Sequence, residues 1–292
     1  MVNICRGTTL KRQIPHVRQS FNWDCGFACL EMALRALGVS QKDCSLQQLR
    51  SRVPSSSIWT VDLAHVLRDY GVRFRFLTAM PGVNPAYQHE AFYKPTIDSD
   101  SERVLRLFEK AAERDISIER ASLSSQQLQE LVVSDVNIVM VLVDRRRLYR
   151  SAGDSINGLV ESLSQCIVGS YVGHYVLITG YNEGRAEYNL MDPARSGDEL
   201  SVRADDLNAA RLSHGTDEDI IVIPWDQHAL PNANAARADG DASLSHCSER
   251  GVLKRDAEAR AKHADKHAES ELGCGIERDA SSASSAAART GG

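Results

Sequence analysis

No stretch of this 292-residue sequence is apolar over the roughly 18 residues that a membrane-spanning helix needs. The N-terminal segment MVNICRGTTLKRQIPH also lacks the apolar core of roughly 7–15 residues that a secretory signal carries. Both absences argue against membrane insertion and secretion. We therefore expect no membrane partner and a cytoplasmic location.

Positive charge is not in excess either. The chain carries 34 Lys and Arg against 39 Asp and Glu, which gives a formal net charge of −5. A protein that binds nucleic acid needs a basic surface that neutralises phosphates. The charge balance therefore predicts no nucleic-acid partner.

The cysteines show no pairing pattern. Seven is an odd number, and they are scattered without regular spacing, at Cys5, Cys25, Cys29, Cys44, Cys166, Cys247 and Cys274. Free thiols in a reducing compartment are the simplest explanation. Cys25 and Cys29 lie one helical turn apart, but no further ligands follow at zinc spacing, so we expect no metal site.

Aromatic residues are missing from the last fifth of the chain. Residues 232–292 contain no Phe, Trp or Tyr and few large aliphatic residues. Such a segment cannot bury enough apolar surface to offset the entropy lost on ordering. We therefore expect one folded domain over residues 10–228, followed by a low-complexity, disordered tail over 229–292.

The hydrophobic pattern within 10–228 changes from helical spacing to strand patterns along the chain. Helices are expected at 25–37, 45–53, 60–71, 101–115, 124–134 and 203–212. Strands are expected at 72–77, 137–144, 174–182, 186–193 and 219–224. The pattern predicts an α+β fold in which N-terminal helices pack on a C-terminal antiparallel sheet.

Cys25 lies at the expected start of the first helix. Unpaired backbone N–H groups and the helix dipole stabilise an anion there, which lowers the pKa of a thiol and favours its reactive thiolate form. Asp24 is expected to cap the helix, and Gly26 to leave the backbone open to a substrate. The alternative is that Cys25 is a small buried apolar residue without a chemical role. For Cys29, one turn further along the helix, we prefer that interpretation.

A thiolate nucleophile needs a base and a group that orients the base. The turn NEGR, centred near residue 183, places His174 directly opposite Asp192 in a regular hairpin, with Cβ atoms about 4.5–5.5 Å apart. Val176, Ile178 and Leu190 then lie on the same face. The alternative is a purely structural His–Asp pair that links the two strands.

Gln19 lies six residues before Cys25, in an expected loop. Its side-chain amide is suited to donate a hydrogen bond to an oxyanion that forms beside the thiol. A loop glutamine without any such role is the alternative, since glutamine is common on protein surfaces.

Four separated motifs occur in an order that resembles one family. They are VRQSFNWDCGFACLEMALRALG, SIWTVDLAHVLRDYGV, GHYVLITGYN and NLMDPA, and the resemblance covers most of residues 13–224. The chain resembles the guanylyl cyclase family of plants, which animals share as guanylyl cyclase domain-containing proteins. The resemblance implies a papain-like fold similar to that of bacteriocin-processing peptidases. It also implies a site of Gln19, Cys25, His174 and Asp192.

The family name implies a different chemistry, in which GTP is converted to cyclic GMP with Mg²⁺ or Mn²⁺ as cofactor. The sequence contains no G-x-x-x-x-G-K-[ST] loop that would cradle phosphates. The acidic run IDSDSE (97–102) is typical of a polar loop and helix cap. The basic run DRRRLYR (144–150) is compatible with a phosphate contact or with a solvated loop.

Three functional hypotheses follow. The first is a thiol hydrolase that acts on an amide, peptide or isopeptide bond of a peptide or protein substrate, without a cofactor. The second is a guanylyl cyclase with GTP as substrate. The third is a binding module that keeps the geometry of the site without turnover.

Overall fold

The computed structural model of the chain describes residues 14–134, 136–149, 171–197 and 199–227. Most of the domain that the sequence predicts, 10–228, is therefore described. The residues of that domain outside the description are 10–13, 135, 150–170, 198 and 228. The predicted tail, 229–292, lies outside the described residues.

Helices dominate the first half of the described chain, as expected. They are α1 (Cys25–Ala36), α2 (Gln41–Cys44), α3 (Leu46–Arg50), α4 (Thr60–Asp69), η1 (Pro85–His89), α5 (Ile97–Ala111), η2 (Ala112–Arg114), α6 (Ser125–Val133), α7 (Arg145–Leu148) and α9 (Ala204–Arg211). Among the described residues, none of these helices combines the length and apolar character that crossing a bilayer requires.

The strands form one mixed sheet of seven within the described residues. They are β1 (Arg75–Thr78), β2 (Ser117–Arg120), β3 (Asn137–Asp144), β4 (Gly173–Asn182), β5 (Glu187–Met191), β6 (Leu200–Arg203) and β7 (Ile220–Pro224). Their order is β2-β1-β7-β3-β4-β5-β6, and only the β1–β2 pair is parallel. The α+β class and the mainly antiparallel sheet are thus confirmed.

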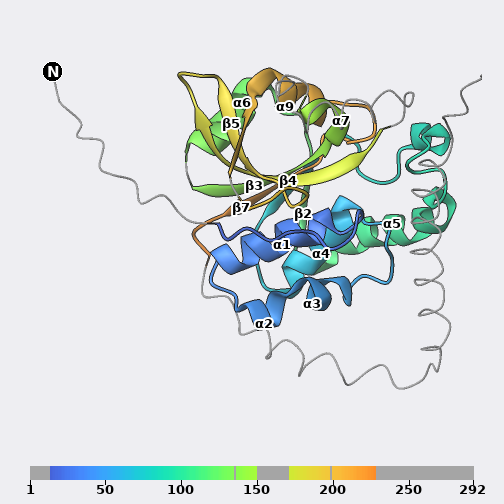
Figure 1. The fold of residues 1–292 in the computed structure, drawn as a ribbon. Helices are drawn as coiled ribbons and strands as arrows, with labels where there is room; N and C mark the ends of the chain where they lie inside the picture. Colours follow the sequence, from blue (N-terminus) through green and yellow to red (C-terminus); the bar gives the residue numbers. More distant parts are fainter. Residues whose placement is uncertain (1–13, 135, 150–170, 198, 228–292) are drawn as a thin grey trace, which may run out of the picture. The chain divides into compact units, whose positions relative to one another are not determined.

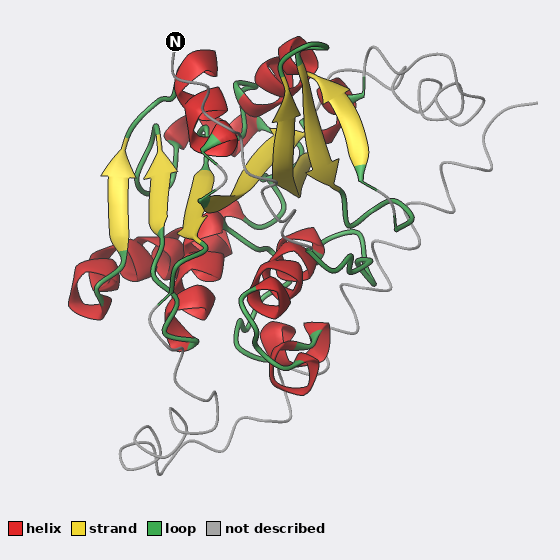
Figure 2. Ribbon diagram, turned by 90° about the vertical axis from the view of Figure 1, so that its left-hand side faces the viewer, coloured by secondary structure: helices red, strands yellow, loops and turns green. Residues whose placement is uncertain are grey.

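Both faces of the central strands are covered, and this explains their apolar sequences. Alternate residues of β3 belong to two separate hydrophobic clusters: Met140 and Leu142 pack with the N-terminal helices, whereas Val139 and Val141 pack in the cluster that contains Leu128 of α6 and Leu207 of α9. Figure 1 shows α1 and α4 on one face of the sheet and α6, α7 and α9 on the other. Figure 2 shows the strands between these two sets of helices.

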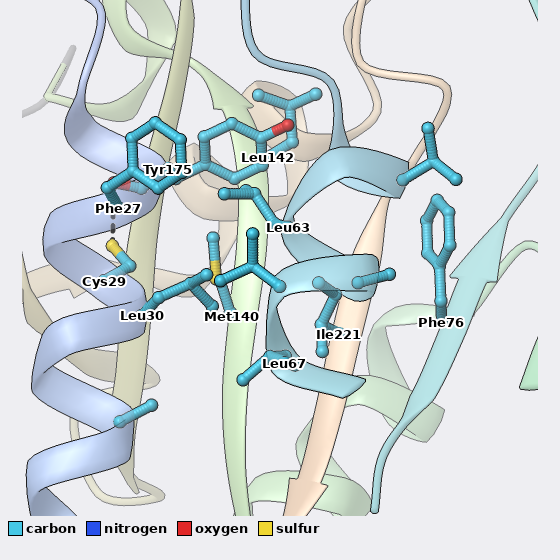
Figure 3. Packing of buried hydrophobic residues seen from close by; sticks show 14 of the residues in the cluster. Phe27, Cys29, Leu30, Leu63, Leu67, Phe76, Met140, Leu142, Tyr175 and Ile221 are labelled. Atoms are coloured by element: carbon cyan, nitrogen blue, oxygen red, sulfur yellow. Dashed lines mark hydrogen bonds between the residues drawn. The ribbon is translucent and has the colours of Figure 1, made fainter. Parts of the chain in front are cut away.

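Helix α1 is the central element of the larger cluster. Nearly all of its residues are buried, and Leu30 meets side chains of α4 and of the sheet (Figure 3). The thiol of Cys29 donates a hydrogen bond to the carbonyl oxygen of Tyr175 on β4, at 3.4 Å. Burial raises the pKa of Cys29 well above its usual range. Cys29 is therefore a core residue, as predicted.

Thr60 stands at the first position of the helical pattern 60–71 and is, by residue type, a plausible N-cap, but α4 begins differently. Trp59 occupies the N-cap position, and its backbone N–H donates to the carboxylate of Asp62 at 2.9 Å. Thr60 is instead the first helical residue, and its hydroxyl lies 2.8 Å from the hydroxyl of Tyr175. The hydroxyl of Thr60 therefore contacts Tyr175 on β4 instead of capping the helix.

Gly26 is required for close packing, and the expectation that it leaves the backbone open to a substrate is wrong. The residue is buried. A Cβ atom at this position would lie 2.7 Å from Cδ1 of Leu63 and 3.2 Å from Cδ2 of Tyr175. The glycine therefore lets α1 approach α4 and β4 at the point where Cys25 is positioned.

Replacing Gly26 with Val should destabilise the protein by about 2–3 kcal/mol, because the added methyl groups overpack a filled core. Urea denaturation measures this loss. Gly180→Val is the matched control, since the nearest atom to a Cβ at Gly180 lies 3.7 Å away. Equal denaturation midpoints for both variants would contradict the packing role of Gly26.

Candidate active site

Cys25 is the first residue of α1, and its side chain is almost entirely buried, with 5% exposed. A residue at this position lies beside N–H groups that have no partner within the helix, and at the positive end of the helix dipole. The predicted placement of Cys25 at a helix start is therefore confirmed.

His174 and Asp192 are brought together as the sequence predicts. His174 Nε2 lies 2.7 Å from Asp192 Oδ1, and both residues are buried. The contact forms in a register that differs from the expected one. Leu177 pairs with Met191 and Ile178 with Leu190, so this end of the hairpin is displaced by two residues, and a bulge follows between Ile178 and Gly180.

The displaced register still allows the contact because side chains alternate between faces with a period of two. A shift of two residues keeps His174 and Asp192 on the same face, as diagonal rather than direct neighbours. Val176, Ile178 and Leu190 lie together in one hydrophobic cluster, as predicted. The pair therefore lies at the edge of that apolar layer.

Cys25 lies close enough to His174 to act on its imidazole. Because Nε2 of His174 is engaged by Asp192, Nδ1 is the ring nitrogen left for the thiol. Burial by itself lowers the pKa of His174, but the interactions with Asp192 and Cys25 outweigh it and raise the pKa to about 9. The imidazole therefore favours its charged form at neutral pH, which is the form that stabilises a thiolate.

Asp192 is held in its ionised form by several donors. Its Oδ1 accepts hydrogen bonds from His174 and from the backbone N–H of Ala194, at 2.7 Å each. Its Oδ2 accepts one from the hydroxyl of Tyr149 at 2.5 Å. Burial opposes ionisation, yet these hydrogen bonds and the charge of His174 lower the pKa of Asp192 to about 2.

Asp24 anchors the loop before the thiol and does not cap α1, contrary to expectation. It occupies the N-cap position, but its side chain makes no capping hydrogen bond. Its fully buried carboxylate accepts hydrogen bonds from the backbone N–H groups of Ser20 and Phe21, and pairs with Arg50 of α3 at 3.0 Å. The loop that leads into Cys25 is therefore fixed to α3.

Gln19 lies in this loop, and its backbone ties the loop to the turn that carries Asp192. Its backbone N–H donates to the carbonyl of Pro193 at 2.9 Å. Nearby, His16 Nε2 lies 3.0 Å from the carbonyl oxygen of Asp192. The side-chain amide of Gln19 donates to the carbonyl of Phe21 at 2.7 Å. Its role toward an oxyanion stays a prediction.

Two residues that contact Asp192 were not predicted. Tyr149 belongs to the basic run 144–150, whose arginines suggest a phosphate contact rather than a contact with Asp192. His16 has no sequence signal that connects it with Asp192. Within the run, Asp144 caps α7 and binds Arg146 through both carboxylate oxygens. This aspartate therefore neutralises part of the positive charge that suggested a phosphate contact.

A metal ion is implied by the cyclase chemistry of the resembled family. Among the described residues, no group of three or more His, Cys, Asp or Glu side chains is arranged to hold one. The acidic run 97–102 forms the first turns of α5, and Asp100 within it accepts a hydrogen bond from the indole of Trp59 and pairs with Arg103. The described residues therefore hold no ready-made cluster of three or more protein ligands for Mg²⁺ or Mn²⁺.

The His174–Asp192 pair should stabilise the fold within a defined pH range. The pKa of Asp192 is lowered from about 3.9 to about 2, so its contribution is complete above pH 4 and lost as pH falls through about 2. The pKa of His174 is raised from about 6.5 to about 9, so its contribution is complete below pH 6.5 and lost as pH rises through about 9.

The Asp192→Asn variant should therefore have a free energy of unfolding about 1–3 kcal/mol lower than wild type near pH 5–6. Its stability should also depend less on pH at both the acidic and the alkaline limit. Urea denaturation across this range measures the effect. Asp115→Asn is the control, because Asp115 pairs with Arg68 while its side chain is 82% exposed. An equally large loss of stability in Asp115→Asn would contradict the prediction that the buried His174–Asp192 pair stabilises the fold more than an exposed ion pair does.

Comparison of the sequence with known proteins places the chain in a family. Residues 14–223 match the family model described as guanylylate cyclase. The chain is 41% identical over 212 residues to guanylyl cyclase 1 of Arabidopsis thaliana, an alignment that covers 72% of this chain and 75% of that protein. The family model spans the segment that carries Cys25, His174 and Asp192. Both matches confirm the family that the four motifs predict. The chain belongs to the guanylyl cyclase family.

Proposed function

We propose that this domain is a thiol hydrolase with a papain-like arrangement, acting on an amide, peptide or isopeptide bond. One observation carries the proposal: a thiol at the start of a buried helix acts on an imidazole whose Nε2 contacts a buried carboxylate. Nucleophile, base and orienting group in this order are the elements of nucleophilic acyl transfer.

In the proposed reaction, the Cys25 thiolate attacks the carbonyl carbon of the substrate. The oxyanion of the tetrahedral intermediate accepts hydrogen bonds from the backbone N–H of Cys25 and from the side-chain amide of Gln19. His174 gives its proton to the leaving amine as the C–N bond breaks, which leaves a thioester on Cys25. Water then attacks the thioester while His174 takes a proton from it. The carboxylic acid leaves, and the thiolate and the imidazolium form again.

The charge states near neutral pH support this cycle. The raised pKa of His174, about 9, means that the imidazole is protonated before the substrate arrives and is ready to act as the acid. The lowered pKa of Asp192 means that the orienting group stays anionic throughout. Both features favour a thiolate–imidazolium pair over a neutral thiol beside a neutral imidazole.

Conversion of GTP to cyclic GMP is the second candidate function. The family name and the 41% identity to guanylyl cyclase 1 favour it, and they support it more directly than they support hydrolysis. Among the described residues, no group of three or more His, Cys, Asp or Glu side chains could hold a divalent cation. We therefore assign no residue to this reaction. The papain-like arrangement and the family name thus point to different chemistry at one domain.

The first test is the reactivity of Cys25. Iodoacetamide should alkylate wild-type Cys25 at pH 6.5, and His174→Gln should slow this by at least about tenfold, because an unassisted thiol ionises near pH 8.5. Peptide mass spectrometry identifies the labelled residue. His65→Gln is the control: His65 is also a buried histidine, but it binds the carbonyl of Leu107.

Acyl transfer is followed with p-nitrophenyl esters of N-acylated amino acids. Wild type should release p-nitrophenol in a burst and carry one acyl group on Cys25, whereas Cys25→Ala should show neither. Labelling of Cys5 or Cys44 with Cys25 untouched at pH 6.5 would refute the thiol hydrolase.

The second test is a cyclase assay on the full chain. Purified protein with GTP and either Mg²⁺ or Mn²⁺ should yield cyclic GMP if the family name describes this chain, with the product measured by mass spectrometry. Cys25→Ala should leave the rate unchanged, since nucleotide cyclisation has no use for a thiol. A yield no higher than that of heat-inactivated protein would count against the cyclase.

A further inference from the structure

Tyr149 makes the contact that completes the buried carboxylate of Asp192. In the part of the chain that the structure describes, two donors reach Oδ1 of Asp192, whereas Tyr149 is the one donor that reaches Oδ2. The Asp192 side chain is fully buried. A buried carboxylate oxygen that loses its donor carries the full cost of desolvation.

Two elements hold Tyr149 in place. The residue directly follows α7, whose start is capped by Asp144. The guanidinium of Arg195 lies 4.6 Å from the centre of the Tyr149 ring, in a cation–π contact. Arg195 also donates its backbone N–H to the carbonyl of Asp192 at 3.2 Å. The turn that carries Asp192 therefore also supplies the residue that fixes its hydroxyl donor.

We propose that Tyr149, held by Arg195, is a positioning residue that keeps Asp192 aimed at His174, and that it thereby increases the thiolate fraction of Cys25. The inference rests on the proposed thiol chemistry of this site. Tyr149 does not touch the thiol, and its effect is transmitted through the carboxylate and the imidazole.

The direction of the effect follows from the hydrogen bond. Asp192 is already ionised above about pH 4, so the effect acts through its position. The hydroxyl of Tyr149 holds Oδ2, which keeps Oδ1 at hydrogen-bonding distance from His174, where the carboxylate stabilises the imidazolium. The imidazolium in turn stabilises the thiolate. Burial and the charge of Asp192 raise the pKa of Tyr149, so its hydroxyl keeps the proton that it donates. Removing the hydroxyl should therefore weaken every step of this chain.

Tyr149→Phe removes the donor and keeps the ring. The expected result is a pKa of His174 lower by about 0.5–1 unit, measured by NMR titration of the full chain, with the His174 signal assigned by its loss in His174→Gln. Alkylation of Cys25 by iodoacetamide should slow about 3- to 10-fold at pH 7. The rates of variant and wild type should converge above about pH 10, where the thiol ionises unaided.

Tyr70→Phe is a closely matched control. Tyr70 also donates a hydroxyl hydrogen bond, to the carbonyl of Asp43 at 2.6 Å, and the guanidinium of Arg52 lies 4.6 Å from the centre of its ring. Tyr70 lies at the end of α4, and neither Asp43 nor Arg52 belongs to the proposed site. It should leave both the pKa of His174 and the alkylation profile at their wild-type values.

A second variant covers the case in which Tyr149→Phe fails to fold. Arg195→Gln keeps the hydroxyl but removes the cation over the ring, and it should shift the pKa of His174 in the same direction by a smaller amount. An unchanged His174 titration in the folded variants would overturn the inference. So would an alkylation rate that falls equally at pH 7 and pH 10.

The two readouts separate this inference from the proposed function. A wild-type Cys25 that reacts no faster than an ordinary thiol at pH 6.5 would refute the thiol hydrolase. The NMR titration of His174 would still decide whether Tyr149 controls the carboxylate–imidazole pair. A fast wild-type thiol with an unaltered Tyr149→Phe titration would leave the hydrolase standing and remove the role of Tyr149.

Discussion

The hydrogen bond between His174 and Asp192 is the contact on which the rest of the site depends. It fixes the imidazole ring, raises the pKa of His174 to about 9, and so creates a cation beside Cys25. Its geometry depends on the sheet, because the two residues come from β4 and from the turn that follows β5. The elements around the pair bury both side chains.

Helix α1 brings the thiol to this pair. The helix is apolar nearly all round because it packs on β4 on one side and on α3 and α4 on others. Gly26 permits the closest approach, and Asp24 fixes the preceding loop through Arg50. Cys25, the proposed nucleophile, is therefore carried by a helix that is buried over nearly its whole length, and we expect substrates to approach a rigid thiol.

Strong periodic patterns made much of the fold predictable. The bounds of α1 and β3 follow the sequence closely, since each is a long run with one consistent spacing. The four-residue strands β2 and β6 are too short for such a pattern. Both were missed, and they add one edge strand at each end of the sheet.

The site was predictable in its members and not in its details. Cys25, His174 and Asp192 follow from a helix start and a hairpin, and the contact formed even though the register differs by two residues. Asp24 and Thr60 looked like helix caps, yet Arg50 and Tyr175 take their side chains instead. Tyr149 binds Asp192 across 43 residues, a contact that leaves no local pattern. Long-range partners of this kind are set by packing.

The distance along the chain between Cys25 and His174, 149 residues, has a consequence for the growing polypeptide. Synthesis exposes the thiol long before the β4–β5 hairpin exists, so Cys25 is at first without His174. Under the proposed function, the thiol gains its base only when the hairpin docks against α1. The nascent chain would then carry its proposed nucleophile without a partner until the domain has folded.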